Sequence, residues 1–207
     1  MKTLALDCST PQASMALFED DRLVAETGWF EERSRHERLF DAGAELMHEA
    51  GWRWEELELF AVGRGPGAYS GLRVSLLAAQ AWAAPGRRPV VAVSSMEASA
   101  RVWLEATGSP SLWVVGDARR ATWWYGEVIR GQTGTPVPWR VAPCTEIERI
   151  IPANVPVATP HPVVVTTWPT AHVMIPDAPA IARLARTRLH SSVPPEPLLP
   201  LYLHAAV

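Results

Sequence analysis

GRGPGAYSGLR, residues 63–73, is the stretch of this sequence that says most about its architecture. It follows a short apolar segment, residues 59–62, that is typical of a buried strand. It leads into residues 71–84, whose apolar positions recur with helical periodicity, and Ser70 is in position to cap that helix. A strand, a glycine-rich turn and a helix in direct succession predict an α/β protein.

The glycines of this stretch have two interpretations. They leave room for a ligand to approach the backbone at Gly65, Gly67 and Gly71, and the helix N-terminus that follows favours an anion. Alternatively, they only permit a tight turn between strand and helix. The chain has a single lysine, Lys2, so a P-loop, which needs a lysine on the phosphates, is excluded.

The segments on either side complete a first lobe. Three strands at hairpin spacing form a meander, and strands and helices alternate after it. The expected elements are strands at 2–8, 12–18, 22–29, 59–62 and 90–93, and helices at 36–50, 71–84 and 95–107. We therefore place the first lobe in residues 1–107.

The pattern is weaker in residues 108–207, which we assign to a second lobe. Fourteen of the 19 prolines lie after residue 135, and they interrupt the periodicity every few residues. Expected here are strands at 111–115, 121–129 and 135–141, and a single helix at 180–189. The second lobe is thus expected to be shortened and degenerate, with its last residues packing back on the first lobe.

Two aspartates follow strands at matching places in the two lobes. Asp7 is followed by Ser9 and Thr10, which can offer hydroxyls and backbone N–H groups to a phosphate while the carboxylate faces a metal-bound water. The same residues can instead form a turn that satisfies its own backbone. Asp117 precedes the pair Arg119-Arg120, which either binds an anion or is simply solvated.

Composition excludes several classes of protein. The formal net charge of −3 argues against a polycation for nucleic acid. Cys8 and Cys144 make neither a disulfide framework nor a zinc site, and no apolar run is long enough for a membrane span. Two His-Glu steps lack the second histidine of a zinc pair, so no metal site is expected. These features favour a cytoplasmic protein.

Several short segments together resemble the TsaB (YeaZ) family. The most specific is the GPGxxxGLR core of residues 65–73. The others are LALDCST at 4–10, SRHERL at 34–39, VSSMEA at 93–98, DARR at 117–120 and PLYL at 200–203. The resemblance covers residues 1–125 well and the last residues loosely, and residues 130–195 carry none of it.

This resemblance implies an actin-like ATPase fold (ASKHA, ribonuclease H-like) of two related lobes. It implies a non-catalytic scaffold that pairs with the paralogous transferase TsaD to make threonylcarbamoyladenosine on tRNAs that read codons beginning with A. The ATPase TsaE docks on that pair, TsaC supplies threonylcarbamoyl-adenylate, and tRNA is met through the complex. TsaD holds its metal through HxxxH, whereas His36 here is followed four residues later by Phe40.

The last glycine of the chain is Gly134, so no later glycine can close over an adenosine, which also argues against a self-sufficient ATPase. No cofactor is therefore expected, unless ATP or ADP binds at an interface shared with the partner. The alternative is an ASKHA-type phospho- or carbamoyl-transferase that uses Asp7 and the glycine loop.

The family precedent places the partner surface on the helices expected at 36–50 and 71–84, through which the free chain can also form a homodimer. The residues expected to contact the partner are His36, Leu39, Phe40, Leu72, Arg73, Leu76, Ala79, Gln80 and Ala83. On the second helix the apolar stripe consists of Leu72, Leu76, Ala79 and Ala83. Leu77 and Trp82 lie off this stripe and also need to be covered.

Overall fold

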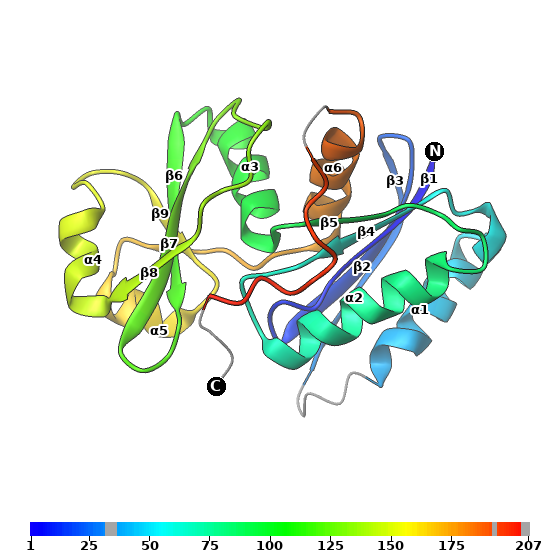
Figure 1. Ribbon diagram of the computed structural model, residues 1–207, viewed down its shortest axis with the longest axis horizontal. Coiled ribbons are helices and arrows are strands. Elements are labelled where there is room, and N and C mark those ends of the chain that lie inside the picture. Colours follow the sequence, from blue (N-terminus) through cyan, green and yellow to red (C-terminus); the bar gives the residue numbers. More distant parts are fainter. Residues whose placement is uncertain (32–36, 192–193, 204–207) are drawn as a thin grey trace.

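A mixed sheet of five strands, in the order β3-β2-β1-β4-β5, forms the first lobe (Figure 1). The computed structural model describes residues 1–31, 37–191 and 194–203. The strands are β1 (Lys2–Asp7), β2 (Gln12–Glu19), β3 (Arg22–Phe30), β4 (Leu59–Gly63) and β5 (Val90–Val93). The first three form the expected antiparallel meander, and β4 and β5 run parallel to β1. Leu6 and Ala5 of β1 face opposite sides of the sheet, in two separate cores.

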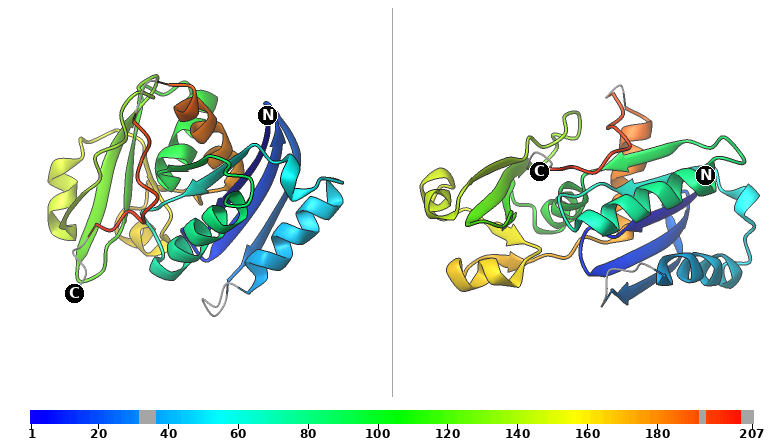
Figure 2. Two further views of the ribbon diagram at one scale, coloured as in Figure 1. Left: turned by 45° about the vertical axis from the view of Figure 1, so that its right-hand side comes forward. Right: turned by 60° about the horizontal axis from the view of Figure 1, so that its bottom comes forward.

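Helices cover both faces of this sheet. They are α1 (Arg38–Glu49), a 3-10 turn at Trp54–Glu56, α2 (Tyr69–Ala83), α3 (Ser95–Thr107) and α6 (Ala178–Leu189). α1 and α2 pack on the face that carries Leu6 and Met15. α6 packs on the opposite face, around Ala5 and Phe18. Figures 1 and 2 show α1 and α2 on one side of the strands and α6 on the other.

The position of α6 departs from the boundary expected at residue 107. Although α6 belongs to the second half of the chain, its Ile181 and Leu184 lie in the core of the first sheet. The Asp177 carboxylate caps the helix by accepting from the Ala180 N–H at 2.8 Å. The first lobe is therefore completed by a helix that follows the second sheet in the sequence.

The second sheet repeats the topology of the first. Its strands are β6 (Ser111–Asp117), β7 (Thr122–Ile129), β8 (Arg140–Pro143), β9 (Val157–Thr159) and β10 (His172–Val173). Their order, β10-β9-β6-β7-β8, again places an antiparallel meander on one side and two parallel strands on the other. The two lobes are thus related, although β9 and β10 have only three and two residues.

The second lobe is more regular than its prolines suggest. The helices α4 (Cys144–Ile150) and α5 (Pro162–Thr167), which the sequence analysis did not predict, pack with Ile147 and Val164 on one face of the sheet. α3 packs on the other face and so lies between the two lobes. The third strand also differs from expectation, because it lies at 140–143 rather than 135–141.

Residues 194–203, which we call the tail, run from the end of the second half back to the first sheet. Glu196 forms an isolated bridge with Ala92 of β5, and the Leu201 N–H donates to the Arg64 carbonyl at 2.8 Å. Among the helices in the described ranges, none has the length and apolar character needed to cross a membrane.

Candidate functional site

The turn that follows β1 is closed on itself. The Asp7 side chain is fully buried, and its Oδ1 accepts from the Ser9 N–H at 2.8 Å and the Ser9 hydroxyl at 2.6 Å. The Thr10 hydroxyl donates to the Gln12 carbonyl at 3.0 Å. Both hydroxyls that were candidates for a phosphate therefore serve the turn itself, as the structural interpretation of this motif predicts.

The second oxygen of Asp7, Oδ2, is buried without a hydrogen-bond partner among the described residues. It lies against Gly63 of β4, where an added Cβ would come within 1.8 Å of it. Burial raises the pKa of Asp7, and the nearby polar groups of Ser9 and Ser95 only partly oppose this effect.

The glycine loop packs directly on the Asp7 turn. An added Cβ would lie 2.1 Å from the Ser9 carbonyl oxygen at Gly67 and 2.1 Å from the Cys8 carbonyl oxygen at Gly71. The Ala68 N–H donates to the Ser9 carbonyl at 2.6 Å. These two glycines therefore permit the close approach of two backbone segments of the same chain, and the space between the two candidate phosphate loops is filled.

The start of α2 corrects the cap expected at Ser70. The helix begins at Tyr69, and its N-cap residue is Ala68, whose side chain makes no capping bond. Gly65 has a φ of +98°, a conformation that favours glycine. Its N–H donates to the Ser95 hydroxyl at 3.0 Å, so the loop is tied to the start of α3 as well as to the Asp7 turn.

Asp117 ends β6 at the place that Asp7 has in β1, but its surroundings are more open. The side chain is half-buried, and its Oδ1 accepts from the Arg119 N–H at 2.7 Å. Residues 119–121 have φ values of 68°, 52° and 56°, three successive non-glycine residues in the left-handed region. The Arg119-Arg120 pair is thus held outward on a strained and exposed hairpin turn.

His161 is a neighbour of Asp117 that the sequence analysis did not single out. The imidazole Nδ1 of His161 accepts from the backbone N–H of Asp117 at 3.0 Å. The backbone N–H of His161 donates to the Thr159 hydroxyl at 3.1 Å. Burial lowers the pKa of His161, which favours the neutral imidazole that accepts this bond. In the sequence, the only feature that could have pointed to His161 is its place as a polar residue shortly after the three-residue strand β9.

Most of the expected partner surface is inside the first lobe. Five of the nine residues are no more than 3% exposed, namely Leu39, Leu72, Leu76, Ala79 and Ala83. This corrects the prediction, because the main apolar stripe of each helix is needed by the sheet it covers. Phe40 is 53% exposed, Arg73 is exposed and Gln80 is half-buried, whereas His36 lies outside the described residues.

α2 nevertheless presents a second apolar stripe to solvent. Leu77 is 66% exposed, and Ala81 and Ala84 follow it on the same side of the helix. Trp82 joins this stripe to α1 through an edge-on contact with Phe40, at 5.8 Å between ring centroids. We call Phe40, Tyr69, Arg73, Leu77, Ala81 and Ala84 the α1–α2 face.

The tail meets one end of the α1–α2 face. The Tyr202 ring stacks on Tyr69 at 5.2 Å between centroids, and the Arg73 Nε donates to the Tyr202 hydroxyl at 2.8 Å. The Arg73 guanidinium lies 4.0 Å from the centre of the Tyr69 ring. Tyr69 and Tyr202 stay 54% and 43% exposed, so these stacked rings extend the apolar surface.

Comparison with known proteins identifies the family to which this chain belongs. The model of a family described as "TsaD: tRNA N6-adenosine threonylcarbamoyltransferase" matches residues 31–135, just over half of the chain. The tRNA threonylcarbamoyladenosine biosynthesis protein TsaB of Escherichia coli is 27% identical over 136 residues, 65% of this chain and 58% of that protein. The chain belongs to this TsaD family and, within it, to the TsaB (YeaZ) group.

Other relatives agree with this placement. The Bacillus subtilis protein of the same name is 30% identical over 97 residues, 47% of this chain and 42% of that protein. The matches thus span roughly half the length of these curated relatives. The crystal structure of YeaZ from Pseudomonas aeruginosa superposes with a TM-score of 0.80 at 25% identity, over 98% of this chain and 99% of that one. The family and the two related sheets together give the predicted actin-like ATPase fold.

The chemistry available at the two turns is limited. The described residues contain no group of three or more His, Cys, Asp and Glu side chains that could hold a metal ion. Among the described residues of the two turns, the carboxylate oxygen that lacks a partner is Oδ2 of Asp7, which is buried against Gly63 at the start of the glycine loop. The α1–α2 face and the Asp117 turn, by contrast, are exposed to solvent.

Proposed function

We propose that this chain is a non-catalytic subunit in the biosynthesis of threonylcarbamoyladenosine on tRNA, and that it pairs with the transferase TsaD. The names of its E. coli and B. subtilis relatives support the pathway. The observation that carries the non-catalytic role is the packing of the glycine loop on the Asp7 turn. On this proposal TsaE docks on the pair, tRNA is met through the complex, and TsaC is a pathway partner that supplies threonylcarbamoyl-adenylate.

The packed loops argue against a catalytic nucleotide site in this lobe. A phosphate held between the Asp7 turn and the glycine loop would have to displace the 2.6 Å hydrogen bond from Ala68 to Ser9. It would also have to separate the backbone at Gly67 and Gly71 from the carbonyls they touch. An enzyme that must bind ATP in every turnover would have to reopen this packed region each time.

The α1–α2 face supports the role of a partner. α2 is apolar on its buried side and again along Leu77, Ala81 and Ala84, although a helix that covers only its own sheet needs one such side. Small alanines beside an exposed leucine allow another helix to approach closely. A specific complex of ordinary size buries roughly 800 Å² on each partner, which two helices and the stacked Tyr69 and Tyr202 can supply.

The pairing is tested by purifying this chain together with the TsaD of the same source, followed by size-exclusion light scattering. We expect a one-to-one complex that Leu77→Glu abolishes, because the substitution places a charge in the apolar stripe. Val163→Glu is the matched control, since Val163 is 57% exposed on α5 of the other lobe. Both variants should keep the circular dichroism of the wild type.

Two results would count against the proposal. A complex that survives Leu77→Glu would place the contact elsewhere, and folded proteins that do not associate would remove the scaffold role. Mass measurements on the chain alone show, in the same run, whether this face also forms a homodimer.

A second candidate function is a phospho- or carbamoyl-transferase that uses ATP. It is favoured by the unpartnered Oδ2 of Asp7 at the end of β1, where a carboxylate could face a metal-bound water if the loops separated. Turnover of ATP by the purified chain, lost in Asp7→Ala, would support it. Nucleotide binding that appears only in the complex with TsaD would instead indicate a site shared at the interface.

A further inference from the structure

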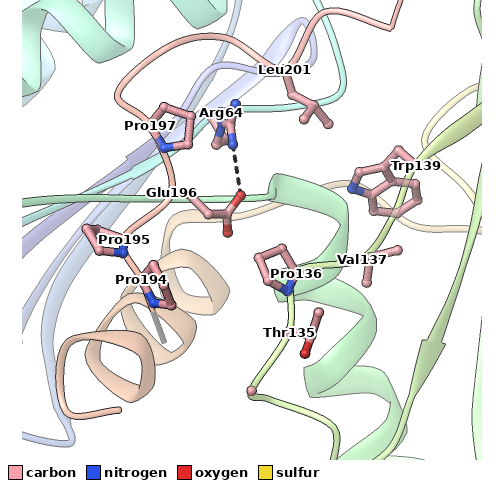
Figure 3. Close-up of a pocket in the computed structure, with 11 residues that line it drawn as sticks. Arg64, Thr135, Pro136, Val137, Trp139, Pro194, Pro195, Glu196, Pro197 and Leu201 are labelled. Atoms are coloured by element: carbon pink, nitrogen blue, oxygen red, sulfur yellow. Dashed lines mark hydrogen bonds and ion pairs between the residues drawn. The ribbon is translucent and has the colours of Figure 1, made fainter. Parts of the chain in front are cut away.

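A cavity of about 450 Å³ lies where three distant segments of the chain meet (Figure 3). Its walls are Arg64 of the glycine loop, residues 134–139 between β7 and β8, and residues 194–201 of the tail. The lining is mainly apolar, since it contains four prolines, Val137, Trp139 and Leu201. The volume falls within the range of small-molecule sites, whose lining is also mainly apolar. Asp7, Ser9 and Asp117 do not line this cavity, so it is separate from the turns at the ends of β1 and β6.

The walls are held in place by buried hydrogen bonds. The Trp139 indole donates to the Ser94 hydroxyl at 3.1 Å, and the Val137 N–H donates to Oε2 of Glu97 at 3.2 Å. Both bonds anchor the 134–139 segment to the start of α3. The indole N–H is thereby satisfied, and what Trp139 offers to the cavity is a flat ring. These two bonds fix the 134–139 wall of the cavity against α3.

One hydrogen-bond acceptor on the wall has no partner. The Glu196 side chain is 8% exposed, and one carboxylate oxygen pairs with Nη1 of Arg64 at 3.0 Å. The other, Oε1, is buried without a hydrogen bond among the residues that the structure describes. Figure 3 shows this carboxylate directed from the tail toward the 134–139 segment. A buried acceptor of this kind is costly when it is left unpaired.

The charges behind the walls select against a charged ligand. Five buried charged side chains form ion pairs here: Arg64 pairs with Glu196, and both Arg101 and Arg188 pair with Glu97. Three arginines and two glutamates leave one positive charge in excess. A cation would be repelled by the arginines, and an anion would meet the carboxylate of Glu196. An uncharged donor meets neither penalty.

We propose that this cavity binds a small, uncharged aromatic or heteroaromatic compound with an N–H or O–H donor at the edge of its ring. The ring packs against Trp139 and the prolines, and the donor bonds to the carboxylate of Glu196. This inference is independent of the proposed pairing with TsaD.

The test is a titration of the full chain with indole and with N-methylindole, followed by two-dimensional NMR. The two probes share a ring, but only indole has the donor. We expect saturable shifts in residues 134–139 and 194–201, and at least about fivefold tighter binding of indole. Tryptamine and indole-3-acetate, which carry opposite charges, should both bind more weakly than indole. Equal affinities for indole and N-methylindole, or no saturable shifts, would overturn the proposal.

A pair of variants locates the site. Thr135 is exposed at the cavity rim, so Thr135→Trp fills the space without disturbing the core, whereas Ala106→Trp places the same side chain on the exposed side of α3. Thr135→Trp should weaken indole binding at least about tenfold, and Ala106→Trp should leave it unchanged. Unfolding curves confirm that both variants fold. Unchanged binding to Thr135→Trp would refute the assignment to this cavity.

Discussion

Asp7 and Asp117 end corresponding strands of two sheets that share one strand order, but their surroundings differ. Asp7 is fully buried beneath a loop whose glycines touch its turn. Asp117 is half-buried beside a hairpin turn that stands open, with Arg119 and Arg120 exposed. The same topology therefore supports a packed turn in one lobe and an exposed, strained turn in the other. Whether such a strand end is packed or open therefore depends on the loop that lies against it.

The largest effect is expected where the packed turn is forced open. Gly67→Ala would place a Cβ 2.1 Å from a backbone carbonyl that cannot move aside, and should lower the free energy of unfolding by about 3 kcal/mol or more. Gly134→Ala is the matched control, because nothing lies within 4 Å of its added Cβ, and should change the stability by about 0.5 kcal/mol at most. Urea unfolding measures both. Equal effects would show that the loop is not packed on the turn.

That glycine loop marks a limit of what the sequence could predict. The pattern correctly indicated a tight turn between β4 and α2, since glycines between a strand and a helix require one. It did not distinguish room for a ligand from room for the chain itself. Only the position of the Cys8 and Ser9 carbonyls, 55 or more residues away in sequence, decides between them.

The first-lobe elements were predictable, as were β6, β7 and α6, whereas the remaining elements between β7 and α6 were not, for a physical reason. β1 to β3 are long enough to show alternation, but β9 and β10 have three and two residues and carry no period. Two prolines that were interpreted as breaks in the periodic pattern instead lie where helices begin. Pro143 immediately precedes α4, and Pro162 is the first residue of α5. Proline is well suited to a first helical turn, where its missing N–H leaves no bond unmade.

A similar ambiguity explains why five of the predicted partner contacts are buried in the first lobe. Helical periodicity identifies the stripe at Leu72 and Leu76, which serves the chain's own sheet. In the sequence, the exposed stripe that begins at Leu77 could be recognised only from apolar residues that do not belong to the main stripe of α2. The Arg64–Glu196 pair beside the cavity joins positions that no local pattern connects.

The second prediction concerns the charge sealed under the loop. Burial raises the pKa of Asp7 in the folded state, so the folded protein holds this proton more firmly than the unfolded chain does. The stability contributed by Asp7 is then fully present below the unfolded pKa, near 4, and is lost as the pH rises through the folded pKa. Asp7→Asn removes this dependence.

The stability of Asp7→Asn relative to the wild type should therefore increase as the pH rises from 4 to 7. Urea unfolding of both proteins across this range measures the difference. Parallel stability curves would mean that the carboxylate is solvated in solution, and that the Asp7 turn is as open as its counterpart at Asp117.

The smallest effect is expected at the open turn. Arg120 is exposed and has a φ of 52°, a conformation that costs energy for any residue with a Cβ. Arg120→Gly relieves this cost but gives the unfolded chain more freedom, so the net gain in stability should be only about 0.5 kcal/mol. Arg120→Ala removes the same charge and keeps the Cβ, and should therefore leave the stability unchanged. Thermal unfolding of the two variants separates strain from charge. If they behave alike, the left-handed turn is relaxed, and the contrast between the two lobes lies in the packing around Asp7 alone.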